Sequence, residues 1–266
     1  MTFSPIHEYF IFNDEVQDTK CFVHSEDMGG IYEVLRVKDG IPLFLEDHLQ
    51  RLKKSAEIAQ QKIPYSEKRI EELLYILIET NKVSEGNILI SYEISMKAFF
   101  ISHSYPTEEM YKSGVVCGIL DAERKNPNAK VFQAAVRQKA NKMIEEKGFY
   151  EVLLADASGR ITEGSRSNVF FVHDEKIVTT PGSKVLLGIT RQKAIELAGM
   201  LNIDVVEKEI SYNELQKFEA VFLTGTSPKI LPIQQINIFE FNTSESILRK
   251  IMNAYDSLIE QYIANK

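Results

Sequence analysis

Alternating apolar and polar residues predict strands in the first 120 residues, together with two helices. Lys38-Asp39-Gly40 is expected to turn one strand into a hairpin. We expect Asp47 to cap the first helix and Ser66 to open the second, because apolar residues recur at helical spacing after each. The expected strand segments are 8–13 (EYFIFN), 31–37 (IYEVLRV) and one or two strands within 87–105.

A polar segment divides the chain. Residues 121–130 (DAERKNPNAK) contain Asn-Pro-Asn and show no periodicity, which is typical of a linker or of a loop at a domain edge. We place a domain boundary here. The prediction is a small N-terminal α/β domain over residues 1–120 and a larger, strand-rich domain over 121–266.

The second half alternates short strands with small-residue turns. A helix is expected to open at Gly188-Ile189-Thr190, with Leu201 among its inward residues, and the final helix carries an apolar stripe that ends near Tyr262. Residues 220–233 read as a strand, a small-residue turn and another strand. The other expected strands are 151–156 (EVLLAD), 160–162 (RIT), 168–172 (NVFFV) and 176–180 (KIVTT).

Composition narrows the class of protein. The 266 residues are 44% hydrophobic and 26% charged, as in ordinary globular proteins. The net charge of −7 comes without a basic run, which argues against a nucleic-acid-binding surface. No segment approaches the roughly 20 apolar residues that span a membrane, and the first residues lack the pattern of a signal peptide, so we expect a cytoplasmic protein without membrane or nucleic-acid partners.

The two cysteines, Cys21 and Cys117, give neither a disulfide framework nor a zinc-ligand spacing. Both lie in apolar contexts. We therefore expect two buried thiols and no metal site.

Candidate chemistry gathers around the segment 163–172 (EGSRSNVFFV). Glu163 adjoins apolar strands, and a carboxylate in such a place needs a partner for its charge; a protonated pyridine nitrogen would serve. The helix start at 188–191 is either an anion-binding terminus or an ordinary Thr-capped helix. The turn 224–228 (TGTSP) adds hydroxyls, and neither segment has the lysine of a P-loop.

A pyridoxal phosphate enzyme needs a lysine for the Schiff base, a group on the ring nitrogen, a phosphate cup and an apolar platform. Glu163, the turn at 188–190 with Thr226, and the Leu186-Leu187 pair offer the last three. The lysine is not identified by these features.

Residues 163–192 (EGSRSNVFFVHDEKIVTTPGSKVLLGITRQ) closely resemble the signature of the class IV aminotransferases. This is the fold-type IV group of pyridoxal phosphate enzymes, which includes branched-chain and D-amino acid aminotransferases and aminodeoxychorismate lyases. Residues 29–57 also resemble the family's N-terminal segment, in which an aromatic-Glu pair precedes a helix with His-x-x-Arg. The resemblance implies a two-domain α/β fold with the cofactor between the domains, and a homodimer.

The resemblance also implies roles for single residues. Glu163 would bind the pyridine nitrogen and keep it protonated, and Leu186 would pack under the ring. Tyr32 would lie beside the substrate, with a half-buried strand tyrosine as the equal alternative. The residues implied for the phosphate are Arg51, Ile189, Thr190 and Thr226.

The small and polar residues that follow Glu163 in the signature also have expected roles. We expect the small residues Gly164, Ser165 and Ser167 to let the backbone pass close to the cofactor. Arg166 is expected to point to an ion pair or to solvent, and Asn168 to satisfy backbone groups around the site.

The family's lysine falls on Lys130, counting back from Gly148. Residues 130–133 read KVFQ where the family usually has Lys-x-x-Asn. Lys139 and Lys142 therefore remain alternatives, although both belong to a charged helix on which lysines are normally solvated.

Three functions follow from the resemblance. The first is an aminotransferase that exchanges an amino group between an amino acid and a 2-oxo acid, with branched-chain substrates as the default and Lys130 as the base. The second is a lyase of the aminodeoxychorismate type, and the third is a relative that has lost catalysis. Residues 90–105 contain no arginine, which counts against a D-amino acid enzyme with a two-carboxylate trap.

Overall fold

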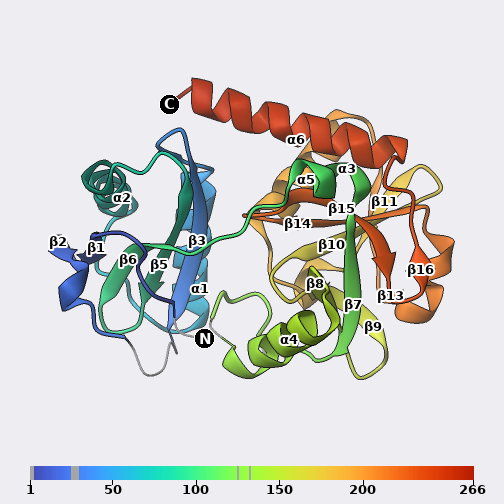
Figure 1. Cartoon of the computed structure of the whole chain (residues 1–266), viewed down its shortest axis with the longest axis horizontal. Helices are drawn as coiled ribbons and strands as arrows, with labels where there is room; N and C mark the ends of the chain where they lie inside the picture. Colours follow the sequence, from blue (N-terminus) through green and yellow to red (C-terminus); the bar gives the residue numbers. More distant parts are fainter. Residues whose placement is uncertain (1–2, 25–29, 125, 132) are drawn as a thin grey trace. The chain divides into compact units, whose positions relative to one another are not determined.

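The computed structural model describes residues 3–24, 30–124, 126–131 and 133–266 (Figure 1). The chain forms two compact units. Unit 1 comprises Met1–Ser104, Ala129–Phe132 and Ile259–Lys266, and unit 2 comprises Tyr105–Asn128 and Gln133–Leu258. This division describes where the chain is compact, and the functional domains 1–120 and 121–266 stay a prediction.

Unit 1 contains a six-stranded sheet in the order β2-β1-β6-β5-β3-β4, in which neighbouring strands are antiparallel. The predicted strands are confirmed, and 87–105 supplies two of them. Lys38-Asp39-Gly40 turns β3 into β4 with Gly40 at a positive φ of 75°. The strands are β1 (Tyr9–Phe12), β2 (Glu15–Asp18), β3 (Ile31–Lys38), β4 (Ile41–Pro42), β5 (Gly86–Tyr92) and β6 (Met96–Ile101).

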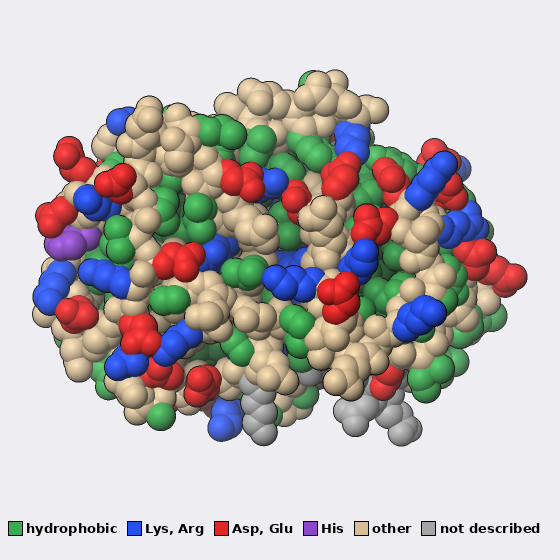
Figure 2. Space-filling view, turned by 180° about the vertical axis from the view of Figure 1, so that it is seen from behind, with side chains coloured by type: hydrophobic (Ala, Val, Ile, Leu, Met, Phe, Trp, Pro, Cys, Tyr) green, Lys and Arg blue, Asp and Glu red, His purple; other side chains and the backbone are tan. Residues whose placement is uncertain are grey.

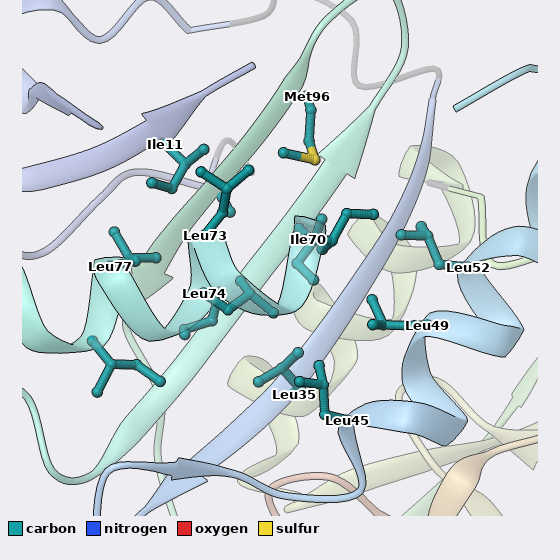
Figure 3. Close-up of a cluster of buried hydrophobic side chains, with 14 of the residues drawn as sticks. Ile11, Leu35, Leu45, Leu49, Leu52, Ile70, Leu73, Leu74, Leu77 and Met96 are labelled. Atoms are coloured by element: carbon teal, nitrogen blue, oxygen red, sulfur yellow. The ribbon is translucent and has the colours of Figure 1, made fainter. Parts of the chain in front are cut away.

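Two helices, α1 (Leu45–Ile58) and α2 (Glu67–Asn81), pack on one face of this sheet. Figure 3 shows their apolar side chains meeting those of the strands. Residues of β3 alternate between buried and half-buried positions, as the period of two predicts. The labelled core residues are Ile11, Leu35, Leu45, Leu49, Leu52, Ile70, Leu73, Leu74, Leu77 and Met96.

The predicted helix starts have different outcomes. Ser66 is the N-cap of α2 and accepts a hydrogen bond from the Arg69 N–H, as expected. Asp47 is not a cap, because α1 begins at Leu45 and its N-cap residue is Phe44, with a φ of 52°. Asp47 lies in the first turn instead, where the helix dipole favours a carboxylate.

Unit 2 contains a ten-stranded mixed sheet in the order β12-β11-β10-β14-β15-β7-β8-β9-β13, with β16 paired to β15. The strands are β7 (Val115–Asp121), β8 (Glu151–Ala155), β9 (Arg160–Gly164), β10 (Asn168–His173), β11 (Lys176–Thr179), β12 (Val205–Glu207), β13 (Ile210–Ser211), β14 (Ala220–Gly225), β15 (Lys229–Ile236) and β16 (Phe239–Glu240). The four helices are α3 (Glu108–Ser113), α4 (Ala134–Lys147), α5 (Ile189–Met200) and α6 (Ser246–Ala264), of which α6 continues past Leu258 into residues of unit 1. Among the described residues, short 3₁₀ helices cover Thr19–Cys21 in unit 1 and Gly182–Lys184 and Tyr212–Lys217 in unit 2.

The strands and the two helices predicted in this half are confirmed, but Leu201 of this half and Cys21 of the first half are placed differently. Leu201 is 39% exposed, since α5 ends at Met200 and Leu201 is already its C-cap. Cys117 is buried as predicted, whereas Cys21 lies exposed in a short 3₁₀ turn.

The end of α6 makes polar contacts within unit 1. The Tyr262 hydroxyl donates to Glu46 over 2.7 Å and accepts the Leu45 N–H over 3.1 Å. Burial and the Glu46 carboxylate raise the pKa of Tyr262. The tyrosine expected in an apolar stripe therefore supplies a partner to one of the first N–H groups of α1, which have none within the helix.

Charged side chains of both signs are interspersed on the face drawn in Figure 2. In the described part of the chain, every helix is too short or too polar to cross a membrane.

Candidate functional site

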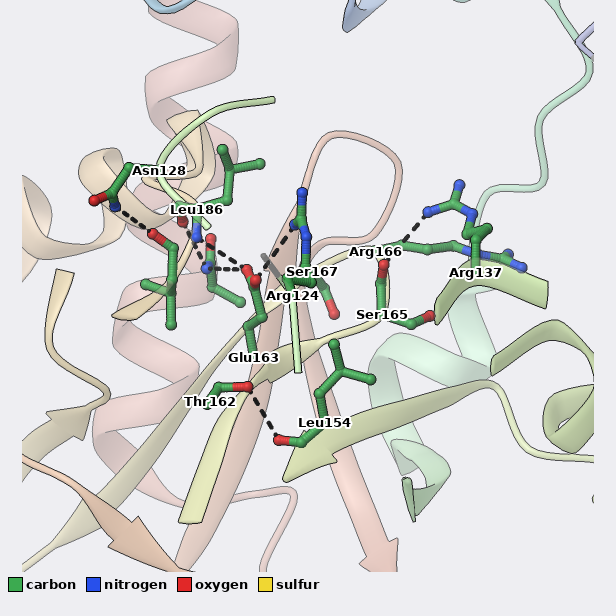
Figure 4. Close-up of polar contacts among 12 residues, drawn as sticks. Arg124, Asn128, Arg137, Leu154, Thr162, Glu163, Ser165, Arg166, Ser167 and Leu186 are labelled. Atoms are coloured by element: carbon green, nitrogen blue, oxygen red, sulfur yellow. Dashed lines mark hydrogen bonds and ion pairs between the residues drawn. The ribbon is translucent and has the colours of Figure 1, made fainter. Parts of the chain in front are cut away.

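Glu163 is buried in β9, with 2% of its surface exposed, and its carboxylate contacts Leu186, Asn168 and Arg124 of unit 2 (Figure 4). One oxygen accepts the Leu186 N–H over 3.1 Å and lies 3.4 Å from the Asn168 side-chain nitrogen. The other oxygen lies 3.3 Å from the Arg124 guanidinium. These donors replace the hydrogen bonds to water that the carboxylate loses on burial.

Two side-chain amides hold the loop that carries Leu186. Asn168 donates to the Leu186 carbonyl over 2.8 Å, which confirms its predicted role in satisfying backbone groups. Asn128 donates to the carbonyls of Gly182 and Val185, each over 2.8 Å. The loop is thereby fixed with the Leu186 N–H directed at Glu163.

The serines of the signature bind a second carboxylate, Glu151 of β8, which is 3% exposed. Ser165 donates to Glu151 over 2.6 Å, Ser167 over 3.1 Å and the Arg166 N–H over 3.1 Å. A Cβ on Gly164 would lie 2.1 Å from the Ser167 hydroxyl oxygen, so a larger residue would have to displace the Ser167 side chain. This arrangement was not predicted from the sequence. The interpretation that the small residues let the backbone pass close to a cofactor stays a prediction.

Arg166 itself is exposed, and its guanidinium donates to the Asn141 side-chain oxygen. This agrees with the expectation that it points away from the buried carboxylates.

The start of α5 lies against Asn168. A Cβ on its N-cap residue Gly188 would lie 2.3 Å from the Asn168 side-chain oxygen, so a larger residue would have to displace Asn168. Thr190 is not the predicted cap: it lies in the first turn, buried, with its hydroxyl 3.3 Å from the Tyr255 hydroxyl. The first N–H groups of α5, including that of Ile189, provide the partial positive charge that binds anions.

Thr224 of β14 has a buried hydroxyl without a hydrogen-bond partner among the described residues. It lies directly opposite Asn168 of β10, and side chains at such cross-strand positions share one face of the sheet. A buried polar group without a partner is unusual. The sequence analysis named only Thr226, which is half-buried in the turn after β14; the Thr-Gly-Thr pattern was the available signal for Thr224.

In unit 1, Arg51 and His48 of α1 bind the fully buried carboxylate of Glu33 on β3. Arg51 donates two hydrogen bonds of 2.7 Å, and the His48 Nδ1 lies 2.9 Å from a Glu33 oxygen. Burial acts to raise the pKa of Glu33, but Arg51 and His48 outweigh it and lower the pKa to about 2. Burial also lowers the pKa of His48, so the ring is neutral near pH 7 and its Nδ1–H is the donor.

The glutamate of the aromatic-Glu pair and the His-x-x-Arg segment that carried the resemblance therefore form one group, the Glu33 cluster of Glu33, His48 and Arg51. The phosphate-binding role expected for Arg51 stays a prediction.

The three candidate lysines have different surroundings. Lys130 is half-buried in unit 1, and its Nζ lies 4.9 Å from the centroid of the Tyr32 ring, which is itself half-buried. Lys139 and Lys142 are exposed on α4, as expected for a charged helix, and Lys142 pairs with Glu146 over 3.7 Å. The choice of Lys130 as the catalytic lysine stays a prediction.

One group of side chains in the described part of the chain could offer atoms to a metal ion. His173, Asp174 and Glu219 place one ligand atom each within 4.8 Å of one another on the surface of unit 2. The expectation of no metal site stays a prediction.

The Glu33 cluster generates a prediction for the pH dependence of stability. Folding lowers the pKa of Glu33 from 4.5 to about 2. The charged carboxylate therefore stabilises the fold above pH 4.5, and this stabilisation is lost as the pH falls from 4.5 toward 2. Glu33→Gln should reduce the acid-induced loss in the free energy of unfolding by on the order of 3 kcal/mol. Near pH 7 the variant should be less stable than the wild type by about 3–5 kcal/mol, because the Arg51 charge loses its partner.

Denaturant unfolding followed by circular dichroism measures both effects. Glu85→Gln is the matched control, since Glu85 pairs with Arg36 over 2.6 Å but is 51% exposed. Its stability should change by less than about 1 kcal/mol. Equal loss of stability on acidification in Glu33→Gln and in the wild type would contradict the prediction.

Comparison with known proteins gives a consistent result. The model of the family described as amino-transferase class IV matches residues 30–236. The chain is 28% identical over 254 residues to D-alanine aminotransferase of Bacillus licheniformis, with 85% of this chain and 88% of that protein covered. It is 28% identical over 268 residues to a probable branched-chain-amino-acid aminotransferase of Rickettsia bellii, with 93% and 91% covered.

Among solved structures, the branched-chain amino acid aminotransferase of Escherichia coli superposes with a TM-score of 0.86 at 23% identity, covering 95% of this chain and 95% of that chain. The two-domain fold-type IV architecture implied by the resemblance is confirmed. The family match spans well over half of the residues and contains the Glu33 cluster, Glu163 and the start of α5. The chain belongs to the class IV aminotransferase family.

Proposed function

We propose that this chain is a pyridoxal phosphate-dependent aminotransferase that moves an amino group between an amino acid and a 2-oxo acid. The observation that carries the proposal is Glu163, a buried carboxylate at the start of the family signature that is held by three donors. A carboxylate so held suits the protonated nitrogen of a pyridine ring.

The residues of unit 2 fit this cofactor. A helix terminus with free N–H groups suits a phosphate, and the buried hydroxyl of Thr224 lacks a partner among the described residues. The close packing of Gly188 on Asn168 brings the start of α5 toward the face on which Asn168 reaches Glu163. When bound, the cofactor supplies an electron sink for the pair of electrons left when the substrate Cα loses its proton.

Each residue then has a defined task. Glu163 would hold the proton on the ring nitrogen, and Leu186, which is 8% exposed, would pack against the ring. Lys130 would hold the cofactor and, when free of it, would move the proton at the substrate Cα. Tyr32 would lie beside the substrate. The residues that would bind the phosphate are Arg51, Ile189, Thr190 and Thr226.

The relatives that carry D-alanine and branched-chain names are equally identical to this chain. The absence of arginine from residues 90–105 favours a substrate with one carboxylate and an apolar side chain. We propose branched-chain amino acids as the first substrates to test, with a cytoplasmic homodimer as the form of the enzyme. A lyase and a non-catalytic relative are the competing functions.

Substrate class has a direct test. The holoenzyme is mixed with L- and D-forms of branched-chain amino acids and of alanine, and conversion of pyridoxal phosphate to pyridoxamine phosphate is followed by absorbance. Conversion is expected with L-branched-chain amino acids. Conversion only with D-alanine would contradict the branched-chain proposal, and no conversion with any amino acid would leave the lyase or the non-catalytic relative.

Lys130 should carry the cofactor. Borohydride reduction of the yellow holoenzyme followed by peptide mapping should find the label on Lys130, because it is half-buried while Lys139 and Lys142 are exposed. Lys130→Ala should bind the cofactor without a reducible linkage. A label on Lys139 or Lys142 would overturn the assignment.

Glu163→Gln should keep cofactor binding but slow the half-reaction by about 10²-fold, because a neutral partner no longer stabilises the charged ring nitrogen. Stopped-flow absorbance with a single amino acid measures this rate. Glu151→Gln is the control, as it alters a carboxylate of similar burial that we assign no contact with the ring. A wild-type rate in Glu163→Gln would show that the role is wrong.

A further inference from the structure

The buried face of α1 contains three polar side chains on an otherwise apolar surface. His48, Arg51 and Ser55 are spaced three and four residues apart, so they lie along one side of the helix. Ser55 is fully buried, with 0% of its surface exposed. Polar groups at such positions need partners inside the protein. His48 and Arg51 find theirs in Glu33, and Ser55 has a different one.

The hydroxyl oxygen of Ser55 accepts the backbone N–H of Lys130 over 3.2 Å. The carbonyl of Lys130 accepts the backbone N–H of Tyr32 over 3.0 Å, and Val131 forms an antiparallel bridge with Ile31. The backbone of Lys130 is thus fixed on both sides within unit 1. Its N–H is bound by α1 and its C=O by β3.

This arrangement also determines where the lysine side chain begins. The Nζ of Lys130 lies 4.9 Å from the centroid of the Tyr32 ring, within the range of a cation–π contact. Burial is the largest cause that lowers the pKa of His48, and the charges of Arg51 and Lys130 lower it further. Lys130 therefore lies close enough to His48 for its charge to act there. One helix and one strand therefore hold the backbone of this lysine, and its Nζ lies over the ring of Tyr32 on that strand.

Serine at position 55 is not explained by the helix itself. Ser55 lies near the end of α1, ten residues after Leu45, so it is no N-cap. Serine also has a lower helix propensity than alanine. An alanine would fill a buried site with less cost to the helix, which leaves the bond to the Lys130 N–H as the feature that requires a hydroxyl.

We propose that Ser55 is a positioning residue for Lys130: its hydroxyl fixes the lysine backbone so that Nζ returns to the same place in every catalytic cycle. The inference rests on the proposed function, in which Lys130 leaves the cofactor when substrate binds and attaches again afterwards. Such a side chain needs an anchored backbone, because a misplacement of about 1 Å can cost on the order of 10²-fold in rate.

The test separates the lysine from the rest of the site by using two cofactor forms. Pyridoxal 5'-phosphate has an aldehyde that reacts with Lys130, whereas pyridoxamine 5'-phosphate has none and binds without the lysine linkage. In the full-length Ser55→Ala variant, attachment of pyridoxal phosphate, measured by absorbance and by borohydride trapping, should be about tenfold slower, which corresponds to the loss of one hydrogen bond. The dissociation constant of pyridoxamine phosphate should stay within about twofold of the wild type, since the phosphate and ring contacts remain.

Two further variants control for damage to the helix. Ala56→Gly weakens α1 at the neighbouring buried position without touching Lys130, and it should attach pyridoxal phosphate at the wild-type rate. Ser55→Cys keeps the side-chain volume with a weaker acceptor and should be slowed in the same direction as Ser55→Ala. It also replaces Ser55→Ala if that variant does not fold.

Each outcome has a distinct meaning. Wild-type attachment in both Ser55 variants would overturn the inference, and so would equal losses of pyridoxal phosphate attachment and pyridoxamine phosphate affinity, which indicate a merely structural serine. If the wild-type chain attaches pyridoxal phosphate at another lysine, or at none, the proposed role of Lys130 fails as well. If the wild type attaches pyridoxal phosphate at Lys130 and the Ser55 variants do so at the same rate, only the inference about Ser55 fails and the proposed role of Lys130 stands.

Discussion

A carboxylate taken out of water must be given donors in its place, and this constraint organises both units of the chain. Glu33, Glu151 and Glu163 are each at most 3% exposed. Glu33 receives a guanidinium and an imidazole, Glu151 two serine hydroxyls and backbone N–H groups, and Glu163 a backbone N–H, an amide and a guanidinium. Removing one donor of such a carboxylate lowers the free energy of unfolding by more than the intact contact contributes to it, because the remaining charge stays buried without its partner.

The three carboxylates differ in which groups bind them and in which elements those contacts join. A bidentate arginine and a histidine join Glu33 to α1, which fixes that helix on β3. Glu151 draws the signature's serines inward and shapes the turn between β9 and β10. Glu163 receives contacts of 3.1 to 3.4 Å from the Leu186 N–H, Arg124 and Asn168. Asn168 also lies against the start of α5 and opposite Thr224, whose hydroxyl has no partner among the described residues. In the proposed function, Glu163 is the carboxylate that meets the cofactor.

Much of the fold followed from the order of apolar residues. Strands such as β3 and helices such as α2 have clear periods, and the Ser66 cap is a local signal. Two local expectations were wrong. A capping residue at Asp47 was displaced because Phe44 takes a left-handed conformation and starts α1 earlier, and Leu201 is exposed because α5 stops before it.

Sequence supplied candidate site residues only where they form a continuous motif. The signature grouped Glu163, Leu186, Ile189 and Thr190 as candidates, whose roles stay predictions, and the resemblance correctly predicted the family. Contacts between distant segments left no such signal: Ser165 meets Glu151 across 14 residues, and Arg124 meets Glu163 across 39. The hydroxyl of Thr224 became conspicuous only once its strand was paired with β10.

The contrast between a local motif and contacts of distant segments also applies to the choice between Lys130 and the lysines of α4. The motif around Lys130 departs from the family pattern, so the sequence leaves alternatives. In the structure the backbone of Lys130 is bound on both sides, and Lys139 and Lys142 are exposed on α4. The central claim is that Lys130 and Glu163 act on one pyridoxal phosphate. A crystal structure of the chain with this cofactor tests it most directly. We predict continuous density from Lys130 Nζ to the cofactor and the ring nitrogen within hydrogen-bond distance of Glu163; a cofactor joined to another lysine, or a ring nitrogen away from Glu163, would contradict the claim.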